Sequence, residues 1–334
     1  MKAAILEGYR KGGRELIVKD IPVPEIGAHE ILVKIKTAGV NPLDNMIVRG
    51  DVKLIVPYRF PLVMGNEFVG TVTKRGKAAT RFSVGERVYG RMPLGKIGAF
   101  AEYAAVDQAA VARVPAYLSD AEAACVPLTA LTVIQAFALM QPKPGQSVFI
   151  SGGTGSLGAM AIPVAKRLGL TVLTNGSGDE EARVRALGAD VFVDYRKQDF
   201  ADVISDVDFV LDTLGDRALP KEFQVLRQGG RLVSLRGVPN AEFAVRNGMG
   251  AMHRLLFRFA GRKYDAMAAK RNQNYYFVFV HEDGAGLEKL SEMFADKQIE
   301  ASVDEVYCLD DVNKALQKVA AGRSKGKTVL KISD

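Results

Sequence analysis

Residues 147–158 join an apolar run to closely spaced glycines, a combination that can hold a phosphate group. They read SVFISGGTGSLG, and Gly153, Gly155 and Gly158 satisfy the spacing G-x-G-x-x-G, with an expected strand before and an expected helix after. Small residues let the chain turn sharply, let its backbone approach a pyrophosphate, and let the helix begin with free N–H groups. The pattern predicts a dinucleotide site formed by Gly153, Thr154, Gly155, Ser156, Leu157 and Gly158, although a plain glycine turn is the alternative.

The residues after the second expected strand bear on the choice between NAD and NADP. An NAD site usually places Asp or Glu there to bind the ribose hydroxyls, but this strand, 171–174, is followed by Asn175. Nearby acids have another explanation, because Ser177 and Glu180 have the spacing of a capping box. Asn175 and Ser177 can donate hydrogen bonds to a 2′-phosphate and Arg183 can supply charge, so the segment favours NADPH.

Strand and helix patterns alternate from residue 144 onward. Alternation of this kind predicts an α/β fold with a doubly wound parallel sheet. By contrast, residues 1–110 read as short β segments interrupted by Gly and Pro, which indicates a β-rich domain. A capping box, Ser119 with Glu122, opens a helix in which Pro127 should lie near a break. In the α/β part we expect strands at 147–151, 171–174, 191–193, 209–212 and 231–235, and helices at 159–168 and 181–187.

Composition excludes several classes of site and partner. The chain has two isolated cysteines and three histidines far apart, so neither a disulfide framework nor a Cys/His zinc cluster is expected. The net charge of +7 suits an anionic cofactor better than nucleic acid, and the basic stretch 254–271 resembles an amphipathic helix with a solvated face. No apolar run reaches transmembrane length and Lys2 and Glu7 interrupt the N-terminus, so we expect a cytoplasmic protein without a membrane partner.

Further motifs, in order along nearly the whole chain, carry a family resemblance. The chain resembles the zinc-free quinone oxidoreductase and enone reductase branch of the medium-chain dehydrogenase/reductase superfamily. That resemblance implies a GroES-like catalytic domain, residues 1–122 with 282–334, and a Rossmann NADP-binding domain, residues 123–281. The motifs are AGVNPLD at 38–44, GNEFVG at 65–70, GERV at 85–88, LGAD at 187–190 with VDY at 193–195, GGR at 229–231 and GKTVL at 326–330.

The same resemblance assigns roles to residues. It places Asn41, as the catalytic residue, and Thr129 beside the nicotinamide. Around the adenosine 2′-phosphate it places Thr174, Asn175, Gly176, Ser177 and Tyr195. Around the nicotinamide ribose it places Thr213, Leu214, Gly215, Ser234, Leu235 and Arg236, and along the nicotinamide Phe277, Phe279 and Val280. Lys327, in the GKTVL motif, is also expected to bind the cofactor.

Departures from the zinc-dependent relatives restrict the chemistry. Those relatives have Cys where this chain has Asn41, His at Asn66, a second Cys near Leu128, and a four-cysteine lobe that this chain lacks. We therefore expect no metal. At Met46, where relatives of this branch have Tyr or Lys, no proton donor carries over.

Without a metal, a conjugated acceptor is the easier substrate. Reducing an ordinary ketone places a full negative charge on one oxygen, which zinc or a positioned acid normally stabilises. Hydride addition to an enone or quinone gives an anion whose charge is spread by resonance. The sequence thus predicts NADPH-dependent reduction of quinones or α,β-unsaturated carbonyls. A metal-free NADPH-dependent aldehyde or alcohol oxidoreductase and a non-enzymatic NADPH-binding regulatory or RNA-binding protein, using residues 254–271, are the alternatives.

The segment 275–280, YYFVFV, is aromatic and β-branched and carries no charge. It should form the last strand of the nucleotide-binding sheet and lie at its edge. An uncharged edge strand is an aggregation hazard that folds normally cover or pair. We expect a homodimer with this strand at a two-fold seam, the alternative being that residues 237–274 cover the edge.

Overall fold

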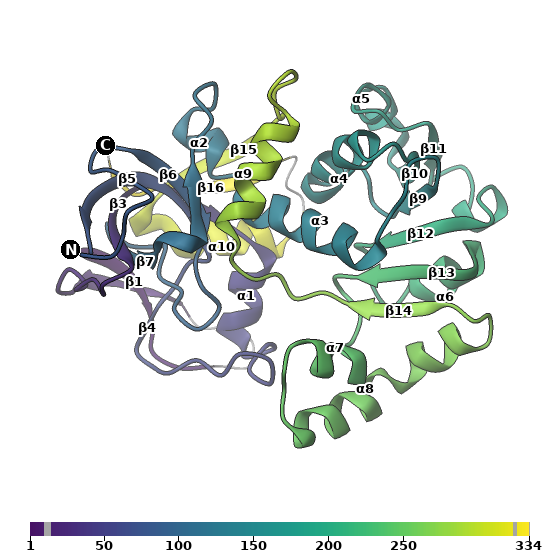
Figure 1. Ribbon diagram of the computed structural model, residues 1–334, viewed down its shortest axis with the longest axis horizontal. Coiled ribbons are helices and arrows are strands. Elements are labelled where there is room, and N and C mark those ends of the chain that lie inside the picture. Colours follow the sequence, from purple (N-terminus) through teal and green to yellow (C-terminus); the bar gives the residue numbers. More distant parts are fainter. Residues whose placement is uncertain (10–14, 323–325, 334) are drawn as a thin grey trace. The chain divides into compact units, whose positions relative to one another are not determined.

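The computed structural model describes residues 1–9, 15–322 and 326–333, and it divides into two compact units (Figure 1). Residues 1–131 and 281–334 make up the first unit and residues 132–280 the second. The first boundary between these units lies at 131/132, within α3 (Pro127–Met140), where the sequence analysis placed the domain boundary at 122/123; the second lies at 280/281, one residue before the expected 281/282. Before α3, helix α2 (Asp120–Ala123) has the expected capping box of Ser119 with Glu122, and α3 starts at Pro127.

The first unit is rich in β-structure, as the sequence predicted. Its described residues form a small sheet in the order β2-β1-β4 and a larger one in the order β15-β16-β3-β5-β6-β8, with β7 also paired to β3. Its strands are β1 (Lys2–Leu6), β2 (Ile17–Asp20), β3 (Glu30–Val40), β4 (Leu62–Val63), β5 (Glu67–Arg75), β6 (Arg87–Arg91), β7 (Tyr103–Asp107), β8 (Val111–Arg113), β15 (Val303–Cys308) and β16 (Lys327–Lys331), and its other helices are α1 (Pro42–Arg49), α9 (Gly284–Met293) and α10 (Val312–Ala320).

Strand pairing in the larger sheet brings three distant parts of the sequence together. The end of β3 pairs antiparallel with the start of β5, so that Gly39 lies opposite Glu67. The start of β16 pairs with the same end of β3, with Thr328 opposite Val40. Asn41, which follows β3, therefore lies close to both Glu67 and Lys327.

The second unit alternates strand and helix, and all its strand pairs are parallel. The sheet order β11-β10-β9-β12-β13-β14 is 3-2-1-4-5-6 in the order of the chain, that of the Rossmann fold (Figure 1). The elements are β9 (Ser147–Ile150), α4 (Ser156–Arg167), β10 (Thr171–Gly176), α5 (Glu181–Ala186), β11 (Val191–Asp194), β12 (Val207–Asp212), α6 (Leu219–Val225), β13 (Leu226–Ser234), α7 (Ala241–Arg246), α8 (Ala251–Ala269) and β14 (Asn274–Phe277).

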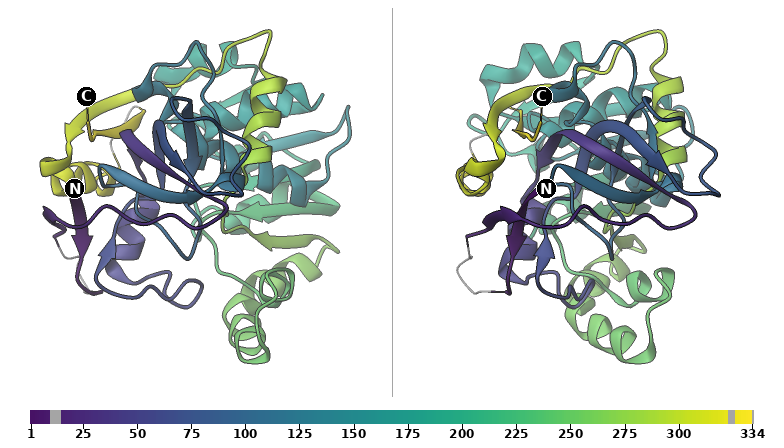
Figure 2. Two further views of the ribbon diagram at one scale, coloured as in Figure 1. Left: turned by 60° about the vertical axis from the view of Figure 1, so that its left-hand side comes forward. Right: turned by 90° about the vertical axis from the view of Figure 1, so that its left-hand side faces the viewer.

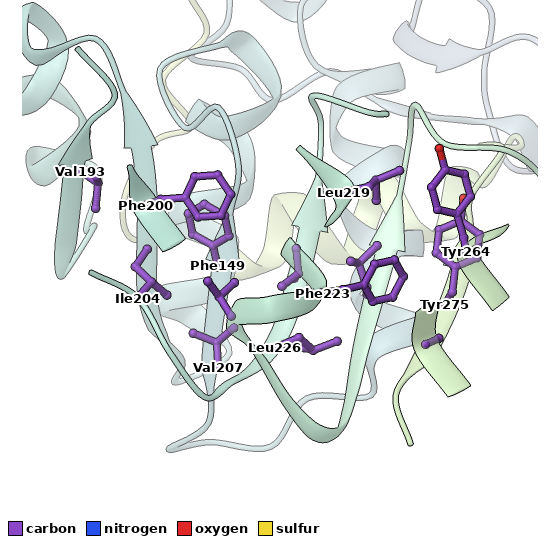
Figure 3. Packing of buried hydrophobic residues seen from close by; sticks show 14 residues of the cluster. Phe149, Val193, Phe200, Ile204, Val207, Leu219, Phe223, Leu226, Tyr264 and Tyr275 are labelled. Carbon is purple, nitrogen blue, oxygen red and sulfur yellow. The ribbon is translucent and has the colours of Figure 1, made fainter. Parts of the chain in front are cut away.

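Apolar side chains of this sheet form a continuous core with the segments that pack on one face (Figure 3). Phe149 of β9 stacks on Phe200, with ring centroids 4.7 Å apart. At the other end of the cluster Tyr275 of β14 meets Tyr264 of α8, at 5.2 Å. The core thereby fixes the carboxyl ends of β9, β10 and β12, where ligands bind in folds of this kind.

β14 lies at the sheet edge, as expected, but it is shorter than predicted and its edge is partly occupied. The Val278 amide donates to the Ser234 carbonyl, so the alternate residues Tyr275 and Phe277 direct their peptide groups to the open side. Their carbonyls accept hydrogen bonds from Asn240 and Arg246. These two donors come from the start and end of α7, which lies with α8 beside β14 (Figures 1 and 2).

The homodimer through residues 275–280 stays a prediction, and pairing at this edge would have to displace both side chains. Replacing Val278 with proline, which removes a backbone donor, would not test this seam, because the Val278 N–H donates to Ser234 within the sheet and does not face the open edge. Light scattering of the wild-type protein at micromolar concentration is the direct measurement. A dimer is expected, and a monomer would contradict the proposed seam.

Among the described residues, one helical stretch, Asp120–Met140, is long and apolar enough to cross a membrane. No run of this length was expected from the sequence. Since 72% of its most apolar window is buried inside the structure, it resembles a core helix.

Candidate functional site

The glycine turn follows β9 directly and leads into α4. A Cβ atom on Gly153 would lie 2.0 Å from Thr174 Oγ1, and one on Gly158 would lie 2.4 Å from the Gly153 Cα. Because real Cβ atoms do not approach other atoms so closely, both glycines are required by the packing of strand, turn and helix. The predicted strand–turn–helix context of the motif is confirmed.

Gly155 differs, because no contact with the described residues requires it to be glycine. Its φ is −76°, and a Cβ atom there would meet only the Gly152 carbonyl oxygen at 3.5 Å, an ordinary contact. It occupies the N-cap of α4 and, being glycine, has no side chain to cap that helix. An uncapped helix N-terminus with open space in front of it suits the pyrophosphate of a dinucleotide.

Two neighbouring residues near the carboxyl end of β10 support the turn. Thr174 Oγ1 donates to the Ile150 carbonyl at 2.6 Å, and Asn175 Oδ1 accepts from the Gly152 amide at 2.8 Å. Both side chains are buried. Their hydrogen bonds therefore shape the glycine turn, which the sequence analysis did not anticipate when it placed them around the 2′-phosphate.

Exposed polar groups follow β10 and β11. Arg183 donates through Nη2 to the Thr154 carbonyl at 2.8 Å and through Nε to Glu180 at 2.7 Å. Tyr195 is exposed. The structure adds Arg196, which the sequence analysis missed and which pairs with Asp179 at 3.0 Å. Arg183 and Arg196 are thus two cations near the end of β10 that a 2′-phosphate could engage.

The capping box predicted for Ser177 and Glu180 is wrong. A 3₁₀ turn, Gly178–Glu180, precedes α5, and the Ser177 hydroxyl donates to Asp179 at 3.3 Å instead of capping a helix.

One buried carboxylate, Asp212, organises the two loops assigned to the nicotinamide ribose. Its Oδ1 accepts from the amides of Leu214 and Gly215, at 2.8 and 2.7 Å, and its Oδ2 accepts from the Ser234 hydroxyl at 2.5 Å. Thr213 Oγ1 donates to the Ser151 carbonyl at 2.6 Å. Asp212 was missed by sequence reasoning, although its position at the end of β12 is a signal that could have found it.

Glu222 of α6 lies beside this carboxylate and is fully buried. Burial and, secondly, the neighbouring Asp212 raise the pKa of Glu222 well above its ordinary value. Its carboxyl is therefore favoured in the neutral form, which limits the charge repulsion beneath the two loops.

The remaining predicted cofactor residues are mostly packed into their own units. Thr129 of α3 is buried, and so is Phe277, whose ring packs edge-to-face on Phe243 at 5.3 Å. Phe279 is half-buried and Val280 buried. The structure therefore gives Phe277 a packing role in the second unit.

In the first unit, Asn41, Glu67 and Lys327 form a buried hydrogen-bonded cluster. Asn41 Nδ2 donates to Glu67 Oε1 at 2.7 Å, and Lys327 Nζ donates to Asn41 Oδ1 at 2.6 Å. Lys327 Nζ also lies 2.5 Å from Glu67 Oε1, and both side chains are almost inaccessible. Asn41 and Lys327, assigned separately by the sequence analysis, are therefore in direct contact.

A second set of bonds extends the cluster to Asp44 and Asn66. Asp44 Oδ2 accepts a hydrogen bond from the backbone N–H of Asn41, and Asp44 Oδ1 accepts one from Asn66 Nδ2, both at 2.7 Å. Asn66 Oδ1 is buried and has no partner among the described residues. In the zinc-dependent relatives described above, metal ligands would stand at Asn41 and Asn66; here both amides bind neighbouring side chains.

Arg91 of β6 lies beside the cluster and was missed by sequence reasoning. It lies opposite Glu67 on the adjacent strand and is fully buried. Its Nη1 donates to the Met92 carbonyl, while Nε and Nη2 have no acceptor among the described residues. These two N–H groups lie on one edge of the guanidinium plane, an arrangement that suits a bidentate oxygen acceptor.

The described residues contain no group of three or more His, Cys, Asp or Glu side chains that could hold a metal ion. The side-chain nitrogens beside the cluster that have no acceptor among the described residues are Arg91 Nε and Nη2, so a further group would receive hydrogen bonds from the guanidinium.

The Asp44 carboxyl should make stability depend on pH near neutrality. Burial raises the pKa of Asp44 to about 7, against hydrogen bonds from Asn41 and Asn66 that lower it. An aspartate in an unfolded chain titrates at about pH 4. The folded protein thus retains a proton that the unfolded chain releases, and this contribution to stability is lost as pH rises from about 4 to about 7.

Asp44→Asn removes that proton-binding group, so the measurement is the free energy of unfolding of wild type and variant across this pH range. The wild-type value minus the variant value should fall with rising pH, by a few kcal/mol, and become constant above about pH 7. Parallel profiles would show that Asp44 does not titrate as described.

Comparisons with known proteins agree with both units. A family model described as alcohol dehydrogenase GroES-like domain matches residues 27–116, and one described as zinc-binding dehydrogenase matches residues 187–330. A solved structure of the quinone oxidoreductase from Coxiella burnetii superposes with a TM-score of 0.84 at 24% identity, covering 100% of this chain and 99% of the other. At that identity the likeness shows the fold.

Two curated relatives are closer in sequence. The chain is 28% identical to the NAD(P)H oxidoreductase RTN4IP1, mitochondrial, of Danio rerio, over 100% of this chain and 92% of the relative. It is 30% identical to the chloroplastic NADPH-dependent alkenal/one oxidoreductase of Arabidopsis thaliana, over 73% of this chain and 66% of that protein. With its GroES-like unit and Rossmann unit, the chain belongs to the medium-chain dehydrogenase/reductase superfamily, as an NAD(P)H-dependent oxidoreductase with quinone and alkenal reductases among its relatives.

Proposed function

We propose that this protein is an NADPH-dependent, zinc-independent reductase of quinones or α,β-unsaturated carbonyl compounds. The observation that supports this most is the buried Arg91, whose Nε and Nη2 have no acceptor among the described residues. It lies opposite Glu67, beside the cluster in which Asn41 and Asn66 stand where zinc-dependent relatives have metal ligands. Donors of this strength suit an anion whose charge is already spread by resonance.

The second unit would hold the cofactor. The open N-terminus of α4 at Gly155 fits the pyrophosphate, and Arg183 and Arg196 supply positive charge near the end of β10. When bound, the nicotinamide supplies hydride to the acceptor. The chain's own contribution is to orient cofactor and acceptor and to provide donors for the oxygen that becomes negative.

NADPH oxidation with a panel of quinones, enones, aldehydes and saturated ketones tests this function. Turnover of quinones or enones is expected. Turnover of aldehydes alone would favour a metal-free aldehyde oxidoreductase. Absence of turnover together with salt-dependent RNA binding would favour the non-enzymatic alternative.

NADPH should bind more tightly than NADH, and Asn175→Asp should reverse this preference. The new carboxylate can still accept a hydrogen bond from the Gly152 backbone N–H, so the turn should persist. Its negative charge repels a 2′-phosphate, and its oxygens can accept a hydrogen bond from a ribose hydroxyl. We expect the ratio of dissociation constants to shift by at least about tenfold, or about 1.4 kcal/mol.

Dissociation constants for both cofactors, measured by fluorescence titration, check this expectation. Asn272→Asp is the matched control, since Asn272 is exposed and precedes β14 at the amino end of the sheet. Equal wild-type affinities, or tighter NADH binding, would rule out the NADPH preference.

A further inference from the structure

Helix α8 (Ala251–Ala269) has two apolar faces, and only one packs against the protein. Phe257, Gly261, Tyr264 and Ala268 are buried and follow the spacing of one helical face. The Tyr264 ring meets Tyr275 of β14, as Figure 3 shows. This inner face fixes α8 to the sheet of the second unit.

The opposite face carries large apolar side chains in solvent. We call Met252, Leu255, Leu256 and Phe259 the outer stripe; they are 82%, 57%, 42% and 61% exposed. Their spacing of i, i+3, i+4 and i+7 places them on one side of the helix. Val245 of α7, nearby in sequence, is also exposed. Exposed apolar residues scattered singly need no explanation, but an aligned set of four indicates a contact surface.

The surroundings of the outer stripe are strongly basic. Residues 251–271 contain six basic side chains and a single acidic one, Asp265, which accepts a hydrogen bond from Asn240. Arg258 and Arg262 make no ion pair with a carboxylate among the described residues. The six are Arg254, Arg258, Arg262, Lys263, Lys270 and Arg271.

The helical period places these charges around the stripe. Arg258 and Arg262 form a row one turn apart along its side, and Lys263 follows Phe259 by one turn. An apolar stripe bordered by Arg and Lys is the pattern of a helix that lies in the plane of a membrane, with its apolar side chains among the acyl chains and its cations at the headgroups.

We propose that α8 docks this protein on anionic phospholipid surfaces through the outer stripe and the flanking Arg258, Arg262 and Lys263. Charge favours this partner over a second copy of the chain, because two copies of α8 facing each other would bring like charges together. It replaces the expectation of no membrane partner, because a helix that lies on a membrane surface needs no apolar run of spanning length. The inference does not depend on the proposed reaction.

The test is co-sedimentation of the full-length protein with vesicles of phosphatidylcholine, with and without phosphatidylserine. Wild type should bind the vesicles that contain phosphatidylserine and should dissociate as salt is raised. Leu255→Ser/Phe259→Ser and Arg258→Glu/Arg262→Glu should each lower the partition coefficient by at least about tenfold. Since all four side chains are exposed, unchanged thermal midpoints should show that both variants fold.

Matched controls come from the first unit. Val84→Ser removes another exposed apolar side chain, and Lys74→Glu/Arg75→Glu reverses two adjacent exposed charges. Both controls should bind vesicles as wild type does. If Lys74→Glu/Arg75→Glu lowers vesicle binding as much as Arg258→Glu/Arg262→Glu does, the effect comes from the net charge of the protein, and the assignment to α8 is overturned.

Three further results would overturn the proposal. Wild-type binding that is absent, or equal for both kinds of vesicle, removes the anionic surface as partner. If Leu255→Ser/Phe259→Ser has a lower oligomeric state than wild type in light scattering without lipid, the outer stripe is a contact between copies of the chain. The charges would be assigned to nucleic acid if the protein binds RNA and no vesicles, and if Arg258→Glu/Arg262→Glu loses the RNA binding that Leu255→Ser/Phe259→Ser keeps.

Discussion

Gly155→Ser should fold as wild type does and bind NADPH at least about tenfold more weakly. The Gly155 backbone suits any residue, and serine is a good N-cap, so the variant should keep or slightly raise the stability of α4. The added side chain would occupy the space in front of the helix where the pyrophosphate is proposed to bind. Overlap of this kind costs about 1–3 kcal/mol, which corresponds to roughly tenfold to a hundredfold in affinity.

Gly158→Ala is the contrasting control. Its Cβ would meet three backbone atoms of Gly153, at 2.4 to 2.6 Å, so it should lower the thermal midpoint whether or not cofactor is present. Calorimetry and NADPH titration of both variants separate the two effects. Wild-type affinity in Gly155→Ser would show that the pyrophosphate does not bind at this helix end.

Lys327→Met should destabilise the protein by about 3–5 kcal/mol, because it removes the one cation that contacts the buried Glu67 carboxylate among the described residues. The loss reflects an uncompensated carboxylate and therefore exceeds the worth of the pair itself. Urea denaturation of wild type and variant, with the midpoint and slope compared, measures it.

The matched control is Lys166→Met, which breaks the partly exposed ion pair with Asp190 in the second unit. A surface pair of this kind contributes about 0–1 kcal/mol. Losses of equal size in the two variants would contradict the description of Lys327 and Glu67 as a buried pair that depends on both members.

Local sequence patterns predicted the parts of the site that are built from adjacent residues. The glycine turn could be found because Gly153, Gly155 and Gly158 lie within six residues and their spacing reflects contacts within one strand–turn–helix unit. The parallel strands were likewise visible as short apolar runs between helices. Their ends differ by a few residues, since hydrogen bonding to neighbouring strands extends or shortens them.

Contacts between distant residues could not be predicted in the same way. Lys327 and Asn41 are 286 positions apart, and only the pairing of β16 with β3 brings them together. Arg91 reads as one more basic residue until β6 places it opposite Glu67. The Ser177 capping box failed for the opposite reason, since the local spacing was correct but a 3₁₀ turn formed instead.

The most direct test of the proposed function compares one enone with the saturated ketone of the same carbon skeleton, using protein dialysed against a chelator and NADPH as reductant. The enone should be reduced at least about a hundredfold faster, a difference of about 2.7 kcal/mol in activation free energy, with less than stoichiometric zinc present. Equal rates for the two compounds, or activity that is lost with one zinc per chain and restored by adding it, would contradict a zinc-independent reductase of conjugated acceptors.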